Sequence, residues 1–155
     1  MNKWFFLNLL LLGTGIWQLA SRGSISVHIL FGALGLLFFL FNWTRHAVFT
    51  TIRNTENRQT KIKLATFSKK IVPFHRWIGT TALLLIVIHA VLVIRLFGFN
   101  WHYPKIVSGL VAGMVLAAMV ISGWMRLIRS TARKRMIHIW LGISLFFAVA
   151  VHLVL

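Results

Sequence analysis

Apolar residues in this chain gather into five long runs that are separated by short, mostly basic segments. The runs cover about residues 4–20, 26–43, 73–97, 106–127 and 136–155. Each approaches or exceeds the ~20 residues with which an α-helix crosses about 30 Å of hydrocarbon. A helix also satisfies its own backbone polar groups where no water is present. The pattern predicts an all-α integral membrane protein, a single domain over residues 1–155 built as a bundle of five transmembrane helices.

Composition supports a membrane protein, because 59% of the 155 residues are hydrophobic and soluble domains contain fewer. The first run also has the basic start and apolar core of a signal peptide. A bulky polar residue, Gln18, stands where such a peptide needs a small residue before cleavage after Ala20. We therefore expect the first run to be an uncleaved helix.

The 17 Lys and Arg residues and the single acid give a net charge of +16, which raises the question of nucleic-acid binding. The charges are unevenly placed along the chain. Eight lie around the connection between the second and third runs, which we expect to be a basic cytoplasmic loop over 45–72, five lie between the fourth and fifth runs, and Lys3 precedes the first. Only Arg22, Arg95 and Lys105 fall on the other side. This is the positive-inside pattern, so we expect a cytoplasmic N-terminus, an external C-terminus, contact with membrane lipid and no nucleic-acid partner.

Several kinds of chemistry have no residues to perform them. No cysteine is present, which excludes disulfides, thiolate-bound iron–sulfur clusters and covalently attached haem. Glu56 is the only acid, so paired-carboxylate catalysis is also excluded. We identify no catalytic residue.

One motif occurs twice in separate apolar runs. The sequence HRWIGTTALLLIVIH begins at His75 and HIWLGISLFFAVAVH begins at His138, and both read H-x-W-[IL]-G-x9-H. The two histidines of each copy, with His89 and His152 in second place, are 14 residues apart. On a helix this interval returns to within about 40° of the same face and separates the rings by about 21 Å. Each helix therefore presents one imidazole near each membrane surface.

The two motif-bearing runs are separated by one crossing, so their helices run in the same direction and their histidines meet at the same levels. His75 should face His138 at the cytoplasmic side, and His89 should face His152 toward the outside. Two neutral imidazoles from different helices are suitable axial ligands for a six-coordinate haem iron. The motif predicts two non-covalent haem b groups, with these four histidines as ligands of the iron.

Other residues near the motif are candidates for contact with the cofactor. Gly79 and Gly142, one turn after the first histidine of each copy, would leave room for a flat macrocycle, although close helix packing is the alternative. For Gly109 and Gly113 we expect helix packing only. Basic residues suited to haem propionates include Arg76 inside and Arg95 outside.

The remaining histidines receive weaker assignments. His28 and His46 share a face of the second run and form a rival ligand set, but they lack the glycine and tryptophan companions. Roles at the membrane interface or at a haem edge are favoured for both. His102 is expected to be solvated in an outer loop.

The FHRWIG and RKRMIHIWLG segments, each followed by its second histidine, resemble the ferric-reductase-like transmembrane domain over roughly residues 25–155. That group includes the haem cores of ferric-chelate reductases and NADPH oxidases and the haem subunit of a methionine sulfoxide reductase system. The resemblance implies an inner haem held by His75 and His138 and an outer haem held by His89 and His152. Many members carry a flavin and nicotinamide domain, which this sequence does not contain, so whether the polypeptide is an enzyme by itself is left open.

The expected function is electron transfer across a cell membrane by a multi-pass, cytochrome b-like protein, with a bacterial plasma membrane favoured. Electrons would come from a separate cytoplasmic flavoprotein or from membrane quinol and pass to an extracytoplasmic acceptor. The alternative is a non-redox membrane scaffold or a histidine-based metal-binding subunit.

Overall fold

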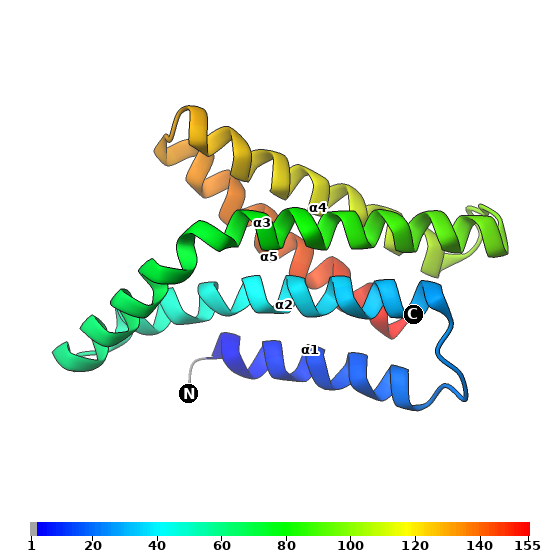
Figure 1. Ribbon diagram of the computed structural model, residues 1–155, viewed down its shortest axis with the longest axis horizontal. Helices are drawn as coiled ribbons and strands as arrows, with labels where there is room; N and C mark the ends of the chain where they lie inside the picture. Colours follow the sequence, from blue (N-terminus) through cyan, green and yellow to red (C-terminus); the bar gives the residue numbers. More distant parts are fainter. Residues whose placement is uncertain (1–2) are drawn as a thin grey trace.

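The computed structural model describes residues 3–155, and Figure 1 shows them as five helices joined by short connections. They are α1 (Lys3–Ala20), α2 (Val27–Asn54), α3 (Arg58–Phe97), α4 (Pro104–Ile128) and α5 (Ala132–Val154). No strand occurs among the described residues. The all-α fold expected from the apolar runs is confirmed.

Four of the helices, α2 to α5, are long and apolar enough to cross a membrane. Many large apolar side chains on them point outward, as a lipid-facing surface requires. The remaining helix, α1, has 18 residues and includes the polar residues Asn8 and Gln18. Both use their amide groups inside the bundle, Asn8 toward the Leu40 carbonyl on α2 and Gln18 toward the Leu153 carbonyl on α5.

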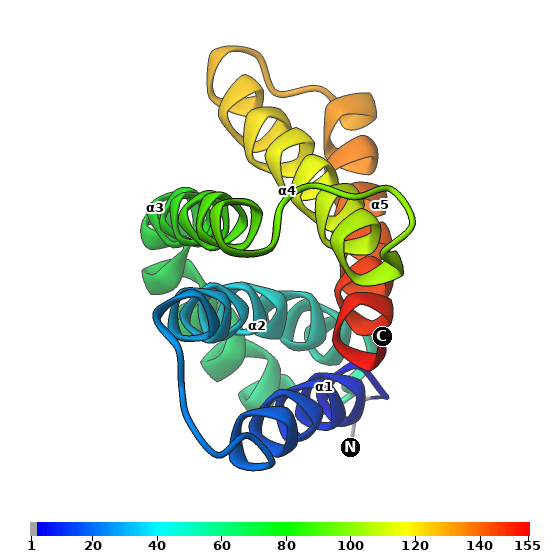
Figure 2. The ribbon, with the colours of Figure 1, turned by 90° about the vertical axis from the view of Figure 1, so that its right-hand side faces the viewer.

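The helices pack as a ring when the bundle is viewed along its length (Figure 2). In this ring α2 packs on α3, α3 on α4 and α4 on α5, while α1 packs on both α2 and α5. The two helices that carry the duplicated motif are therefore not neighbours in the ring: α3 lies between α2 and α4, and α5 lies between α4 and α1. Helices α1, α2, α4 and α5 share a cluster of buried apolar side chains. It includes Phe39 and Trp43 of α2, Leu116 of α4 and Phe146 of α5.

The segment 45–72, which we expected to be a basic loop, is helical except at residues 55–57. It contains no glycine and no proline before Pro73, so its polarity ends the apolar run without ending the helix. Asn57 caps the start of α3, where its side-chain oxygen accepts from the Thr60 N–H at 3.1 Å. The expected helix start at Pro73 is also wrong, because this proline lies inside α3.

Pro73 divides α3 into two parts. Proline lacks the N–H for a helical hydrogen bond and its ring crowds the preceding turn, so it bends helices. Figure 1 shows α3 bending along its length. We call residues 58–72 the α3 arm; it packs beside the second half of α2.

The connection between α2 and α3 and the connection between α4 and α5 lie at one end of the bundle, on the left of Figure 1. Most of the basic residues lie in or near these two connections. We call this end of the bundle the basic end; it is defined by Arg45, Arg53, Arg58, Lys61, Lys63, Lys69, Lys70, Arg76, Arg126, Arg129, Arg133, Lys134 and Arg135. The other end holds the α1–α2 and α3–α4 connections and the C-terminal end of α5. The structure thus concentrates the positive charge at one end of the helices.

Candidate functional site

His75 on α3 and His138 on α5 meet near the basic end. Their ring centroids are 6.2 Å apart and their planes are inclined by 79°. A metal–nitrogen bond to histidine is about 2.0 Å, and the centre of the imidazole lies roughly 1.1 Å beyond the nitrogen, so two rings sharing one metal have centroids about 6 Å apart. The separation of the two rings is therefore the one that a pair of axial ligands requires.

His89 and His152 lie one level away, toward the opposite end of the bundle. Each lies 14 residues beyond the member of the first pair on its own helix. The ring contact of His89, however, is with His28 of α2, at a centroid distance of 6.4 Å and an inclination of 32°. The structure thus places the second pair at a common level but does not bring the two rings into contact.

Two serines of α4 anchor the two histidines of α5. Ser122 Oγ lies 2.9 Å from Nδ1 of His138, and Ser108 Oγ lies 3.1 Å from Nδ1 of His152. Each hydroxyl donates its hydrogen to a carbonyl of its own helix, Ser122 to Met119 and Ser108 to Lys105. A serine whose hydrogen is placed on this carbonyl accepts the hydrogen bond from Nδ1–H of the imidazole.

The two histidines of α3 are anchored by α2 in the same way. Asn42 is buried; its Oδ1 lies 3.1 Å from Nδ1 of His75 and its Nδ2 donates to the His75 carbonyl at 3.0 Å. Nδ1 of His89 lies 2.6 Å from the backbone carbonyl oxygen of His28. Both partners offer an acceptor, so Nδ1 carries the proton in each ring.

One tautomer therefore satisfies all four candidate ligands: the partners of His75 and His89 require it, and the serines of His138 and His152 are compatible with it. Nδ1–H is committed to a neighbouring helix, and the lone pair of each neutral ring is on Nε2. This is the arrangement found in metal-bound histidines, where a second hydrogen bond from the other ring nitrogen fixes the orientation and raises the basicity of the ligand. The residues present fit a metal held by histidine Nε2 between His75 and His138, and His89 and His152 have the same kind of anchor at the other level.

The anchoring residues repeat at the interval of the histidines. Ser108–Gly109 and Ser122–Gly123 are two copies of one dipeptide 14 residues apart, and His28 and Asn42 on α2 are also 14 residues apart. These partners were missed when only the histidine motif was considered. The duplicated Ser-Gly pair in α4 is a signal that could have revealed two of them.

Three glycines leave space for the anchored rings. A Cβ atom built at Gly32 would lie 2.9 Å from Nδ1 of His89, and one at Gly109 would lie 2.8 Å from Cε1 of His152. At Gly123 the nearest atom of His138 would be 3.4 Å away. Helix packing alone was expected for Gly109, but the structure places it directly behind a candidate ligand.

Gly79 and Gly142 are buried and face α2. A Cβ atom at Gly79 would lie 3.3 Å from Nδ2 of Asn42, and one at Gly142 would lie 3.4 Å from the Trp43 ring. Both glycines thus allow α2 to approach the histidine-bearing helices, and Gly79 does so at the residue that anchors His75.

Cations near the first pair lack partners. Nη1 of Arg76 and Nε of Arg126 are buried without a hydrogen-bond partner among the described residues. The Arg76 guanidinium also lies over the Trp124 ring, 5.5 Å from its centroid. The only acid of the sequence is Glu56, which is exposed in the α2–α3 connection. These two N–H groups are suited to an acceptor that the described residues do not supply.

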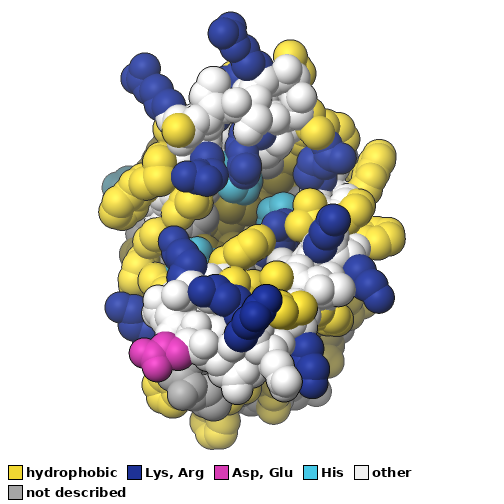
Figure 3. Space-filling model, turned by 90° about the vertical axis from the view of Figure 1, so that its left-hand side faces the viewer, with side chains coloured by type: hydrophobic (Ala, Val, Ile, Leu, Met, Phe, Trp, Pro, Cys, Tyr) yellow, Lys and Arg dark blue, Asp and Glu magenta, His cyan; other side chains and the backbone are white. Residues whose placement is uncertain are grey.

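The surface of the basic end agrees with this arrangement. Figure 3 shows Lys and Arg side chains around a recess between the helices, and histidine side chains are visible in its depth. Arg95, the candidate for the other level, is exposed in the last turns of α3. The structure gives no contact that ties Arg95 to the histidines.

The other histidines lie in different surroundings. His46 packs between Trp4 and Trp43, with centroid distances of 4.8 and 5.0 Å. His102 is exposed and its Nδ1 lies 3.1 Å from Oδ1 of Asn100 in the same connection. Nδ1 of His28 is buried and has no partner among residues 3–155.

No family model, curated protein or solved structure matches the chain. Among the described residues, no three His, Cys, Asp or Glu side chains converge as a metal-binding group. Any function must therefore be argued from the paired histidines and their anchors.

Proposed function

We propose that this protein is a dihaem, cytochrome b-like membrane protein that passes electrons from one side of the membrane to the other. His75 and His138 would hold an inner haem b, and His89 and His152 an outer one. The observation that carries the proposal is that Nδ1 of each of the four rings contacts a polar group of a neighbouring helix, which leaves Nε2 available to a metal in the Nδ1–H tautomer.

In this proposal all five helices cross the cell membrane, with the basic end in the cytoplasm and the C-terminus outside. The gathering of basic residues at one end supports this orientation. A relationship to the ferric-reductase-like transmembrane domain is also proposed, on the strength of the duplicated H-x-W-[IL]-G-x9-H motif.

Three groups of residues have different roles in this proposal. The four histidines bind through Nε2, while Ser108, Ser122, Asn42 and the His28 carbonyl hold the rings in place. Arg76 and Arg126 offer buried N–H groups to the carboxylates of the inner group, and Arg95 is the candidate for the outer one. The bound iron would supply one-electron redox chemistry.

Partners complete the proposed function. The inner level lies near the basic end, where a cytoplasmic flavoprotein or membrane quinol would donate electrons, and an extracytoplasmic acceptor would receive them at the outer level. The two levels are separated by 14 residues of helix, or about 21 Å of rise. The chain would then act as an oxidoreductase component that depends on a separate donor.

The colour of the purified protein tests the proposal. Protein from haem-replete cells should be red, contain two haems per chain and give a low-spin b-type spectrum that sharpens on reduction with dithionite. Colourless protein of the correct fold would overturn the proposal. In that case, a non-redox scaffold or a histidine-based metal subunit would be distinguished by metal analysis of the same sample.

A further inference from the structure

A groove of about 140 Å³ lies between α2 and the α3 arm, on the outer surface of the basic end. Arg45 and Thr44 of α2 and Ser68 of the arm line it, together with apolar residues that include Phe41 and Ile71. Neither Arg45 nor Ser68 anchors a candidate haem ligand. The groove therefore has its own lining, although Arg45 also lies close enough to His75 and His138 for its charge to act on them.

Two residues that line this groove have a polar atom without a partner. Ser68 is only 4% exposed, and its Oγ forms no hydrogen bond with any described residue. Nε of Arg45, one turn from the groove's Phe41, is likewise buried and unpartnered. A buried hydroxyl or guanidinium N–H without a partner is costly, so both groups are suited to an acceptor that the chain does not supply.

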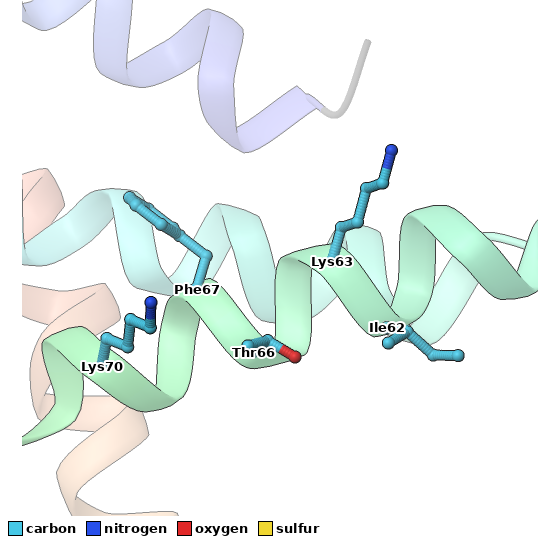
Figure 4. Close-up of a pocket in the computed structure, with 5 residues that line it drawn as sticks. All are labelled: Ile62, Lys63, Thr66, Phe67 and Lys70. Atoms are coloured by element: carbon cyan, nitrogen blue, oxygen red, sulfur yellow. The ribbon is translucent and has the colours of Figure 1, made fainter.

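The charge around the groove specifies that acceptor as an anion. The positive charge of Arg45 interacts unfavourably with that of Arg126, and no carboxylate lines the groove. Phe67 lines the groove and also a neighbouring recess of about 310 Å³, to which the same arm contributes Lys63 and Lys70. Figure 4 shows Phe67 and both lysines extending from one side of the arm.

The depth of the groove places it at a membrane surface. Arg45 is 18 residues after Val27, the first residue of α2, which corresponds to about 27 Å of helix and is close to the ~30 Å thickness of the hydrocarbon. Exposed apolar side chains, Phe41 at 48% and Phe67 at 59%, adjoin the polar atoms. The groove thus combines a cationic, hydrogen-bonding centre with an apolar border at the level of the lipid headgroups.

We propose that this groove binds the phosphate of an anionic membrane phospholipid, with Arg45 and Ser68 as its donors and an acyl chain along Phe41 and Ile71. Inorganic phosphate shares the headgroup chemistry but cannot use the apolar border. The proposal requires only that the helices lie in a membrane, so it does not depend on haem binding.

The test measures lipid binding to the full chain in detergent by native mass spectrometry, with thermal unfolding as the second readout. Phosphatidylglycerol should bind as one retained lipid and raise the unfolding temperature, whereas phosphatidylcholine and inorganic phosphate should do so weakly. Arg45→Gln should weaken the binding of phosphatidylglycerol about tenfold, the size of one hydrogen bond to a charged group. Arg53→Gln, which removes the same charge from an exposed position eight residues along α2, is the matched control.

Ser68→Ala provides an independent variant. Without added lipid it should leave stability unchanged or raise it, because it removes an unpartnered buried hydroxyl. With phosphatidylglycerol it should lose part of the stabilisation that the wild-type protein gains. Equal binding of the two lipids, equal losses in Arg45→Gln and Arg53→Gln, or full stabilisation by inorganic phosphate alone would each overturn the proposal. Haem absorbance of the same samples reports separately on the proposed electron-transfer function.

Discussion

Ser122 Oγ lies 2.9 Å from Nδ1 of His138 while its own hydrogen is donated to the Met119 carbonyl. With its hydrogen in that position the serine accepts from Nδ1–H of the imidazole, which leaves the lone pair on Nε2. Ser108 and His152 repeat the relationship at the other level of the same two helices. The two α4 serines thus orient both candidate ligands of α5.

Loss of this hydrogen bond should weaken the inner haem without abolishing it. In Ser122→Ala, the affinity for the inner group should fall about 10- to 100-fold, the usual effect of removing an outer partner of a metal-bound histidine. Its reduction potential should rise, because a less basic imidazole stabilises the oxidised iron less. Haem content and redox titration measure both effects.

The control for this prediction is Ser144→Ala on α5, which removes an exposed hydroxyl that anchors no ring. It should leave content and potential unchanged. An equal loss in the two variants would show that the serine contact is not part of the site.

The histidines themselves should separate the two haems. His75→Ala or His138→Ala should remove the inner group, and His89→Ala or His152→Ala the outer one, because each iron would lose one of its two ligands. The haem-to-protein ratio should fall from two to one in each variant. His102→Ala, at an exposed ring outside the pairs, should keep both. Two haems with unchanged low-spin spectra in any of the four variants would mean that the pairing is wrong.

The boundaries of the fold could be predicted only where the membrane sets them. Apolar runs located α1, α4 and α5 to within a few residues, since hydropathy there coincides with the helix. Hydropathy did not predict the helix ends between Trp43 and Pro73, where α2 continues to Asn54 and α3 begins at Arg58. Hydropathy depends on whether a segment is suited to water or to lipid, and a helix can continue from one into the other.

The site could be predicted in the same partial way. Helical periodicity alone places His75 level with His138, because both helices run in the same direction. The anchors depend on how α2 and α4 are rotated about their own axes, which is a property of tertiary packing. The sequence therefore did not identify Asn42 and Ser108 as partners of the histidines. The repeated Ser-Gly pair of α4 nevertheless shows the same 14-residue interval as the histidines.

The orientation in the membrane can be measured cleanly because the sequence contains no cysteine. In intact cells, a membrane-impermeant maleimide should label Leu155→Cys from outside and should leave Lys61→Cys unlabelled. The reason is that the proposed orientation places the basic end in the cytoplasm. Labelling of Lys61→Cys before lysis would reverse the proposed donor and acceptor sides. Labelling of both sites after lysis is the control for reactivity.

Gly109 and Gly113 offer a matched pair for testing the space behind a ligand. They lie one turn apart on α4, but a Cβ atom at Gly109 would be 2.8 Å from the His152 ring, whereas one at Gly113 would meet nothing within 4 Å. Gly109→Ala should therefore displace the imidazole from its bond with Ser108. The outer haem should be lost or become high-spin while the inner one persists, since the next level is about 21 Å away along the helix.

Gly113→Ala should keep both haems and gain slightly in helix stability, because alanine is favoured over glycine by up to about 1 kcal/mol inside a helix. Absorption and electron paramagnetic resonance spectra of the two variants report haem content and spin state at each level. If both substitutions removed the same haem, or if Gly109→Ala kept two low-spin haems, His152 would not be held against α4 in the way the structure indicates. The outer ligand would then have to be sought at His28, whose ring lies 6.4 Å from that of His89.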